Sequence, residues 1–415
     1  MYTGCSRPMP YRWWILTLLT LGTVINYLDR LALTLLNPLI REELKLDDET
    51  YGWVTAAFQG CYTIGFLVMG KFVDRYGTRL GYTVAAIWWS FAGIATTFAR
   101  APIDLAVMRG LLGLGEAGNF PSAIKAVAEW FPPKDRAFAT GIFNAGTNVA
   151  TMIGPALFVA MSGMYGWRAC FAITGGLGLI WAITWWFSYY VPQSANEPAG
   201  AKAEPMPWSQ TLRYRQTWGF ALGKFFSDPV WWFLLFWLPL YLYNVRGLDM
   251  KQVSWILPFI YFVADIGSVA GGWLSGYFMR QGWPVARARK AALLVFACMP
   301  PIAAAAVLVD NLYVAVGLFS LATAAHQGWS ANLYTITSDV FPRRAVASVT
   351  GIGGAVGGFS GMLFSAIVPG YVVPRLGYVP LFLGMSCFYL IGWVCIHALL
   401  RNFEPVEDSL AAEQR

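Results

Sequence analysis

Long apolar runs constrain this chain more than any other feature, because each is close to the length of a membrane-spanning helix. An α-helix needs about 20 apolar residues to cross the hydrocarbon core of a bilayer. Only 12% of the 415 residues are charged, against about 25% in a typical soluble domain. The sequence therefore predicts an all-α membrane protein with twelve transmembrane helices. The predicted spans are residues 13–37, 51–70, 80–99, 102–127, 137–161, 168–190, 217–243, 252–276, 290–309, 311–338, 346–370 and 378–400.

The predicted helices form two groups of six, separated by a polar, proline-rich stretch from Pro192 to Gln216. An internal repeat supports this division. A Phe-Pro pair with a downstream Thr-Gly-Ile begins at Phe131 and recurs at Phe341, an offset of 210 residues. Two such halves, related by an axis along the membrane normal, are how major facilitator transporters are built. The predicted organisation is a first half at 1–190, a connector at 191–216, a second half at 217–400 and a tail at 401–415.

The basic residues predict how the chain is oriented in the membrane. With the N-terminus inside, eighteen lysines and arginines fall in cytoplasmic segments and seven in outside segments. Loops rich in lysine and arginine normally stay in the cytoplasm. Both termini and the connector are therefore expected in the cytoplasm, with the protein in the inner membrane. The net charge of +7 is attributed to this asymmetry, so no nucleic-acid partner is expected.

Several kinds of enzyme site have little support in the sequence. The six cysteines are scattered singly, five of them in apolar runs, which fits neither a disulfide framework nor a zinc site. The chain has two histidines, His326 and His397, and no nucleophile motif. We expect no cofactor, no metal and no catalytic residues. The first apolar run is too long and too charged for a cleavable signal peptide, so it is expected to remain as a helix.

Asp29 and Arg30 stand side by side inside the first apolar run. A charge in the bilayer core costs roughly 2.5 to 3.5 kcal/mol on insertion scales, and such residues usually face a bundle interior or a wet cavity. The pair either neutralises itself and holds helices together, or forms a binding site. In the second case Arg30 binds an anion, and Asp29 carries a proton or pairs with Arg30. We favour the binding site, because intramembrane ionisable groups are functional by default.

Arg109 and Glu116 form a second charged set, in the fourth predicted helix. They are seven residues apart, or two turns, and therefore share one face. Either they form a structural salt bridge, or Glu116 is a proton site that Arg109 tunes; we favour the proton site. Gly113 to Gly118 match G-x-G-x-x-G, but no strand precedes this membrane-embedded run. We therefore reject a dinucleotide site and assign these glycines to helix packing.

The loop from Gly70 to Arg79, between the second and third predicted helices, combines glycines, an acid and several bases. Glycines allow a tight turn, and Asp74 can cap a neighbouring helix N-terminus while it pairs with basic residues. The alternative is simple positive-inside charge. The second half has a degraded copy in which Gly276 replaces the acid, so a weaker contact is expected there. The predicted cytoplasmic gate is Gly70, Asp74, Arg75, Gly77 and Arg79.

Other polar side chains also interrupt the apolar helices. Each alone is more often a hydrogen bond between helices than a ligand contact, but together they suit a polyhydroxylated anion. Lys224 and Asp228 are an i,i+4 pair that we expect to neutralise itself, with Lys224 the second choice for the anion. Lys125 is expected to snorkel to water, and Asp265 has no obvious partner. The candidate ligand residues are Gln59, Tyr62, Asn144, Asn148, His326, Gln327, Trp329 and Asn332.

Six stretches of the sequence resemble known transporters. The resemblance covers nearly the whole chain, except the connector and the last fifteen residues. The first four resemble the anion:cation symporter family of the major facilitator superfamily, and the last two are similar to its bacterial hexuronate transporters. The six stretches are Asn26–Arg30, Gly70–Arg79, Gly113–Gly118, Glu129–Arg136, Gly223–Phe233 and His326–Asn332.

The resemblance implies import of a sugar acid coupled to protons. It implies that Arg30 holds the substrate carboxylate, that Asp29 and Glu116 carry protons, and that Tyr62 contacts the substrate. It also implies that the loop from Gly70 acts as a cytoplasmic latch.

Residues and resemblance together predict a monomeric, H+-coupled symporter for a monocarboxylic sugar acid such as glucuronate or galacturonate, working by alternating access. Its expected partners are the small anionic sugar acid, protons and the lipid bilayer. The rivals on the same fold are an anion exchanger, a uniporter, or a symporter for galactonate or glucarate. A passive channel is a further alternative, and a membrane-embedded enzyme is the least supported.

Overall fold

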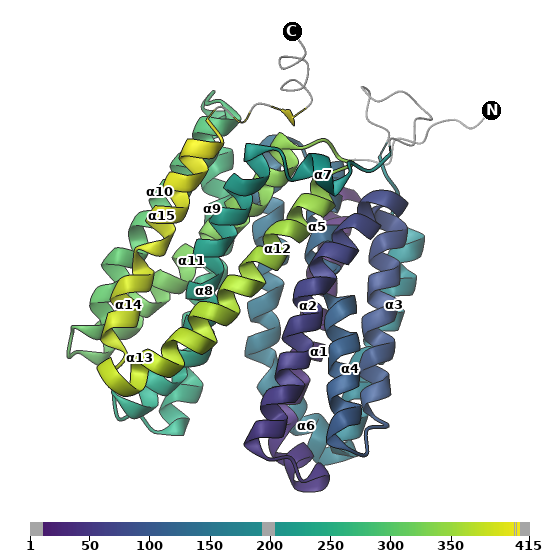
Figure 1. Ribbon diagram of the computed structural model, residues 1–415, viewed down its shortest axis with the longest axis vertical. Helices are drawn as coiled ribbons and strands as arrows, with labels where there is room; N and C mark the ends of the chain where they lie inside the picture. The colour runs from purple at the N-terminus through teal and green to yellow at the C-terminus, as the bar shows by residue number, and fades with distance from the viewer. Residues whose placement is uncertain (1–10, 193–203, 402, 404, 407–415) are drawn as a thin grey trace.

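The computed structural model describes residues 11–192, 204–401, 403, 405 and 406, and every regular element in these ranges is helical (Figure 1). The first group of helices is α1 (Tyr11–Leu44), α2 (Asp48–Tyr76), α3 (Thr78–Thr96), α4 (Pro102–Glu116), α5 (Asn119–Trp130) and α6 (Pro133–Ser188). After the short α7 (Trp208–Thr211) come α8 (Arg215–Asn244), α9 (Met250–Arg280), α10 (Val285–Ala303), α11 (Leu312–Val340), α12 (Val346–Met362), α13 (Val368–Leu376), α14 (Val379–Ser386) and α15 (Phe388–Leu399).

The helices correspond to the twelve predicted spans once their breaks are considered. The 56-residue α6 contains two spans, because Gly166 has φ 78° and interrupts the helix between them. The fourth span is α4 followed by α5, and the eleventh is α12 continued through a short π-helical turn, Leu363–Ile367, into α13. Eight helical stretches of the described chain are long and apolar enough to cross a membrane by length and composition.

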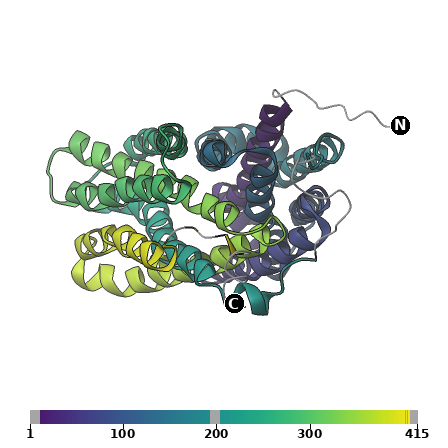
Figure 2. The same cartoon turned by 90° about the horizontal axis from the view of Figure 1, so that it is seen from above.

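The helices gather into two bundles, α1–α6 and α8–α15, which stand side by side in both views (Figures 1 and 2). The first bundle is held by an aromatic stack between α3 and α6. The indoles of Trp181 and Trp185 stack with their centroids 5.4 Å apart, and the ring of Tyr82 lies 4.7 Å from that of Trp181. Such pairs are favourable by about 0.5 to 1.5 kcal/mol beyond their buried area, so they fix how these helices pack.

The loops before α2 and α9 carry side-chain N-caps. Asp47 precedes α2, and its side chain accepts a hydrogen bond from the Thr50 amide at 2.8 Å. Asp249 and Gln252 form a reciprocal capping box at the start of α9, with bonds of 2.7 and 3.0 Å. An N-cap of this kind stabilises a helix by about 1 kcal/mol.

The two bundles meet at the end where α2 finishes and α12 begins, and they separate toward the opposite end (Figure 1). Glycines permit the close approach at that end, which we call the closed end. A Cβ on Gly70 of α2 would lie 2.5 Å from the carbonyl oxygen of Ala347, and one on Gly351 of α12 would overlap the carbonyl oxygen of Phe66. The two bundles are therefore in contact at one end and apart at the other (Figure 1).

Glu43 illustrates the opposite, separated end. Its carboxylate accepts a hydrogen bond from Trp167 Nε1 at 2.6 Å and pairs with Arg168, both in α6. These two interactions, the tryptophan hydrogen bond first, lower the pKa of Glu43 below its ordinary value. The contacts stay within the first bundle, so they tie α1 to α6 without joining the two halves.

The basic-residue asymmetry predicts that the closed end faces the cytoplasm, together with the connector, whose central residues lie outside the described ranges. A reporter fused near Gly200 should be active in the cytoplasm and silent in the periplasm, because loops rich in lysine and arginine stay inside. Paired cytoplasmic and periplasmic reporters at the same position provide the measurement. Activity of the periplasmic reporter alone would reverse the predicted orientation.

Candidate functional site

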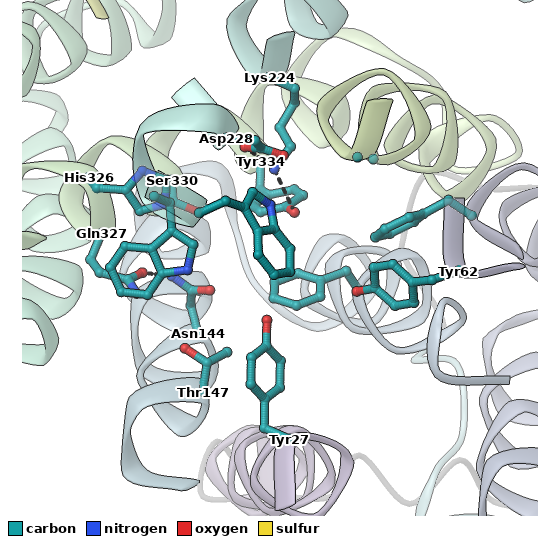
Figure 3. A pocket seen from close by; sticks show the side chains of 16 residues that line it. Tyr27, Tyr62, Asn144, Thr147, Lys224, Asp228, His326, Gln327, Ser330 and Tyr334 are labelled. Carbon is teal, nitrogen blue, oxygen red and sulfur yellow. Dashed lines mark hydrogen bonds and ion pairs between the residues drawn. The ribbon is translucent and has the colours of Figure 1, made fainter. Parts of the chain in front are cut away.

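A pocket lies between the two bundles, with about 570 Å³ of empty space that includes its opening to solvent (Figure 3). Four helices of the first bundle and three of the second contribute to its wall, which mixes aromatic, amide, hydroxyl and charged groups. The lining residues are Tyr27, Tyr62, Phe66, Phe120, Asn144, Thr147, Lys224, Asp228, Trp231, Trp232, His326, Gln327, Ser330, Tyr334, Gly354 and Gly358.

Arg30 lies directly behind this wall, next to Tyr27 and Tyr62. Its guanidinium carbon is 4.5 Å from the Tyr27 ring centroid and 4.4 Å from that of Tyr62. Its Nε donates to Glu116 Oε2 at 2.9 Å, and the two side chains are only 11% and 0% exposed. Both terminal nitrogens of Arg30 are buried without a hydrogen-bond partner in the described part of the chain. Arg30 therefore has one N–H bound to Glu116 and two terminal nitrogens that donate to no described residue.

The salt bridge between Arg109 and Glu116, which was the alternative to a proton site, does not form among the described residues. Both are buried in α4, but Glu116 pairs with Arg30 of α1. Arg109 donates from its two terminal nitrogens to the backbone carbonyls of Asp29 at 3.2 Å and Arg30 at 3.0 Å. Arg109 thus holds α1 in place at the charged turn, and its own charge still lies near Glu116. A shared helix face allowed the pair, but a neighbouring helix supplied a better partner.

Asp29 does not pair with Arg30, contrary to one of the two predicted roles. Its side chain is 1% exposed and makes no ion pair among the described residues. The carboxylate lies beside α3, where a Cβ on Gly93 would stand 3.6 Å from Oδ1. Consecutive residues on a helix point about 100° apart. The two charges of the first apolar run therefore serve different neighbours.

The second bundle contributes its own charged group to the wall. Lys224 Nζ pairs with Asp228 Oδ1 at 2.8 Å, which confirms the predicted i,i+4 pair. The same ammonium donates to the Tyr334 hydroxyl at 2.9 Å and lies 4.4 Å from the centre of that ring. Tyr334 in turn stacks on Phe120 of α5, with centroids 5.1 Å apart. The aromatic stack links this charged group to the first bundle.

The polar residues predicted in α11 divide between two faces. His326 lines the cavity, where its ring stacks on Trp231 and its Nδ1 shares a hydrogen bond with the Tyr389 hydroxyl at 2.7 Å. Trp329 and Asn332 do not line it, so the prediction that they contact ligand is not supported. Trp329 is fully buried against Tyr389, and Asn332 donates to backbone carbonyls within the second bundle.

Two asparagines of α6 join the bundles instead of standing free. Asn144 Nδ2 donates to Gln327 Oε1 at 2.5 Å, and both residues line the cavity. Asn148 Nδ2 donates to Asp265 Oδ1 at 2.7 Å, which gives Asp265 the partner that the sequence did not reveal. Neither Asn148 nor Gln59 lies on the cavity wall. Of the predicted amide ligands, Asn144 and Gln327 are placed to meet a bound molecule.

Asp74 makes the contact that the loop sequence predicted. Its carboxylate accepts from the backbone amides of Ala347 at 3.3 Å and Ser348 at 2.6 Å, and so caps α12 of the other bundle. It also pairs with Lys125 Nζ at 2.8 Å. Lys125 is 4% exposed, so the expectation that it snorkels to water is wrong. A carboxylate at a helix N-terminus is stabilised by the free amides and the helix dipole.

Of the other predicted gate residues, Gly70 contacts the second bundle, and the remaining three make contacts within the first. Gly70 meets α12, whereas Gly77, with φ 86°, forms the turn between α2 and α3. Arg79 donates to the backbone carbonyl of Trp186 at 2.8 Å, and Arg75 lies over its neighbour's ring, that of Tyr76. These last contacts stay within the first bundle.

The closed end also has ion pairs on the side of the degraded loop copy. Asp339 accepts from Arg136 of the first bundle at 3.1 Å and from Arg289 of the second at 2.9 Å. Arg289 is fully buried and also donates to the Pro133 carbonyl at 2.7 Å. The expectation of a weaker contact considered only Gly276, whereas the acid on this side comes from α11.

Asp74→Asn should weaken the closed end, because it removes the charge that caps α12 and pairs with Lys125. Hydrogen bonds to charged groups are worth about 1.5 to 3 kcal/mol each, so the closed population should fall roughly tenfold relative to the open one. Spin labels on unnatural amino acids at the exposed residues Tyr76 and Arg280 would report the distance across this end. Asp135→Asn is the control, and an unchanged distance distribution in Asp74→Asn would contradict the latch.

The lining residues without a role in the sequence analysis include Tyr27, Thr147, Trp231, Ser330 and Tyr334. Tyr27 lies one turn before Arg30, so the helical period carried a signal for it. Ser330 and Tyr334 continue the i,i+4 series from His326 in the same way. Thr147 and Trp231 had no such signal.

Comparisons with known proteins agree with this architecture. A model of the Major Facilitator Superfamily matches residues 19–365. The chain is 34% identical over 413 residues to the hexuronate transporter of Escherichia coli (strain K12), covering 95% of each protein. It is 35% identical over 286 residues to the galacturonate transporter of Dickeya chrysanthemi, which spans 65% of this chain and 83% of that relative.

Among solved structures, the proton:xylose symporter XylE matches with a TM-score of 0.74 at 15% identity, covering 97% of this chain and 99% of that one. This likeness shows the fold alone: twelve transmembrane helices in two halves. The sequence prediction of the fold class is therefore confirmed. The chain belongs to the major facilitator superfamily, and it is a membrane transporter, not an enzyme, related to the transporters of sugar acids.

Proposed function

We propose that this protein is a proton-coupled symporter that imports a monocarboxylic sugar acid, a hexuronate such as glucuronate or galacturonate, across the inner membrane with both termini in the cytoplasm. The relatives' names support this substrate class. The observation that carries the proposal is the buried ion pair between Arg30 and Glu116 beside the cavity.

The pair provides a direct route to coupling. Removing one partner of a buried ion pair destabilises a protein by about 3 to 5 kcal/mol, because the other charge is left uncompensated. Arg30 therefore needs one anion at a time, and Glu116 supplies it in the empty transporter. When Glu116 accepts a proton, the guanidinium becomes free for the carboxylate of a substrate. Proton and substrate thus bind together, and each favours the state in which the other is bound.

The cavity offers the groups that the rest of a sugar acid needs. A hydroxyl both donates and accepts, and the wall carries the amides of Asn144 and Gln327 with the hydroxyls of Thr147 and Ser330. The carboxylate reaches Arg30 by displacing the ring of Tyr27 or Tyr62, which cover it. A ligand in a cavity lined by both bundles is bound differently in the two alternating states, as transport requires.

An affinity panel tests the substrate class. The purified protein should be stabilised in thermal-shift titrations by glucuronate and galacturonate, less by galactonate and glucarate, and not by glucose. A ligand that binds only the folded state raises its stability in proportion to the logarithm of its concentration over Kd. A ranking with galactonate or glucarate first would replace the hexuronate assignment while keeping the fold and the charged pair.

Anion exchange and uniport on the same fold make a different prediction for energetics. Neither accumulates substrate against its gradient when a pH difference is the sole driving force. Proteoliposomes with an acidic exterior should therefore concentrate glucuronate if the proposal holds. Equilibration without accumulation would indicate exchange or uniport.

A further inference from the structure

The Lys224–Asp228 pair is a second charged group in the cavity, and the coupling scheme above does not use it. Lys224 and Asp228 lie on α8, whereas Arg30 and Glu116 belong to α1 and α4. In Figure 3 the pair lies on one side of the cavity, and Tyr27, which stacks on Arg30, lies on the other. A molecule anchored at Arg30 would therefore extend its far end toward the pair.

The acid of this pair is the more accessible member. The side chain of Lys224 is 6% exposed and that of Asp228 is 13% exposed. Two N–H groups of Lys224 are committed, one to Asp228 Oδ1 and one to the Tyr334 hydroxyl. Asp228 Oδ2 accepts no hydrogen bond from the described residues and is absent from their fully buried polar atoms. The pocket wall therefore carries a carboxylate with one oxygen free of hydrogen bonds from the described residues, and an ammonium beside it.

Gly357 of α12 packs directly against this pair. A Cβ on Gly357 would overlap Asp228 Oδ2 and would lie 3.3 Å from Cε of Lys224. The absence of a side chain at 357 thus lets α8 and α12 approach with two charged side chains between them. The carboxylate has little room to retreat on that side, because the glycine backbone supports it.

We propose that the Lys224–Asp228 pair, seated on Gly357, binds the hydroxyl-bearing end of the substrate and excludes a second carboxylate, so that it selects monocarboxylic over dicarboxylic sugar acids. This inference rests on the proposed function, because it takes the first carboxylate to be held at Arg30.

The chemistry of an ammonium–carboxylate pair suits a vicinal diol. One hydroxyl can donate to Asp228 Oδ2 while its neighbour accepts from the third N–H of Lys224, and each hydroxyl is capable of both roles. Hydrogen bonds with one ionised partner are roughly twice as strong as neutral ones. The substrate thus gains two strong bonds without bringing any charge to this end of the cavity.

A dicarboxylic sugar acid meets the same pair on unfavourable terms. Its second carboxylate would meet the like charge of Asp228 in a confined space, while Lys224 is already bound to Asp228 Oδ1 and the Tyr334 hydroxyl. Specificity of this kind comes from an unfavourable contact with the competitor as well as from a favourable one with the substrate.

Asp228→Asn tests this selection, because it removes the excluding charge and leaves Lys224 uncompensated beside the second carboxylate. The ratio of glucarate Kd to glucuronate Kd, measured by calorimetry on the purified protein, should fall at least about tenfold, which corresponds to about 1.4 kcal/mol. Asp135→Asn, an aspartate at the closed end that pairs with Arg12, should leave the ratio as in the parent. An Asp228→Asn ratio within twofold of the parent would overturn the selection.

Gly357→Ala provides a second test that keeps every charge. The added methyl should displace the Asp228 carboxylate and weaken glucuronate binding at least fivefold. Gly384→Ala is the matched control, because a Cβ there meets nothing within 4 Å. Equal glucuronate affinity in Gly357→Ala and Gly384→Ala would contradict the role of Gly357 in positioning the pair. If the parent binds no sugar acid, the proposed function itself fails; if it binds glucuronate but the Asp228→Asn ratio does not move, only the role of the pair fails.

Discussion

Arg30→Ala is expected to abolish measurable binding of a sugar acid. Taking a carboxylate out of water requires a compensating partner, since an unpaired buried charge is strongly disfavoured. A guanidinium offers parallel N–H donors that match the two carboxylate oxygens, and both terminal nitrogens of Arg30 are buried and unsatisfied among the described residues. Two hydrogen bonds to a charged group contribute at least about 3 kcal/mol. Affinity should therefore fall more than about a hundredfold.

Three comparisons make this result specific. Arg30→Lys keeps the charge but loses the fork, so it should bind severely weakened rather than normally. The double variant Arg30→Ala with Glu116→Gln removes both members of the ion pair, so neither is left without the other; it should be folded and still not bind. Arg168→Ala changes an arginine outside the cavity and should bind as the parent does. Tight glucuronate binding by Arg30→Ala would place the carboxylate elsewhere, with Lys224 the next candidate.

Glu116→Gln is expected to abolish accumulation driven by a pH gradient while binding persists. Glutamine cannot carry the proton, and as a neutral group it cannot compete with the substrate carboxylate for Arg30. Substrate should therefore bind and exchange across the membrane, but an imposed proton gradient should no longer concentrate it. Uptake into proteoliposomes, measured once with a pH gradient and once as exchange against internal substrate, separates these two activities.

The control for this variant is Glu43→Gln, which changes a glutamate at the separated end of the first bundle. It should accumulate glucuronate as the parent does. Normal accumulation in Glu116→Gln would remove Glu116 from the coupling step, and Asp29, the other buried carboxylate beside this turn, would become the candidate.

The sequence predicted contacts within one helix and at helix starts better than contacts between helices. The i,i+4 spacing of Lys224 and Asp228 is fixed by the helix itself, and so is the pair. Asp74 could be predicted as a cap because a loop acid between two apolar helices has few other uses. Arg109 and Glu116 also share a face, but Glu116 pairs with Arg30 on another helix. No local pattern encodes which neighbouring helix lies closest.

The same limit explains the mixed result for α11. Spacing shows that His326, Ser330 and Tyr334 share one face, whereas Trp329 and Asn332 fall elsewhere on the helix. It does not show which face meets the cavity, because both carry polar groups and both are buried. The direction is set by packing of Trp329 against Tyr389, a contact between distant parts of the sequence.

The competition of Glu116 and the substrate carboxylate for Arg30 is tested most directly by proton uptake during binding. Isothermal titration of glucuronate in buffers of different ionisation enthalpy, at a series of pH values from neutral to alkaline, gives the number of protons bound with each substrate molecule. The parent should take up about one proton per substrate where Glu116 is ionised, with affinity falling as pH rises, and Glu116→Gln should take up none and bind independently of pH. Equal proton uptake by the parent and by Glu116→Gln would contradict this mechanism.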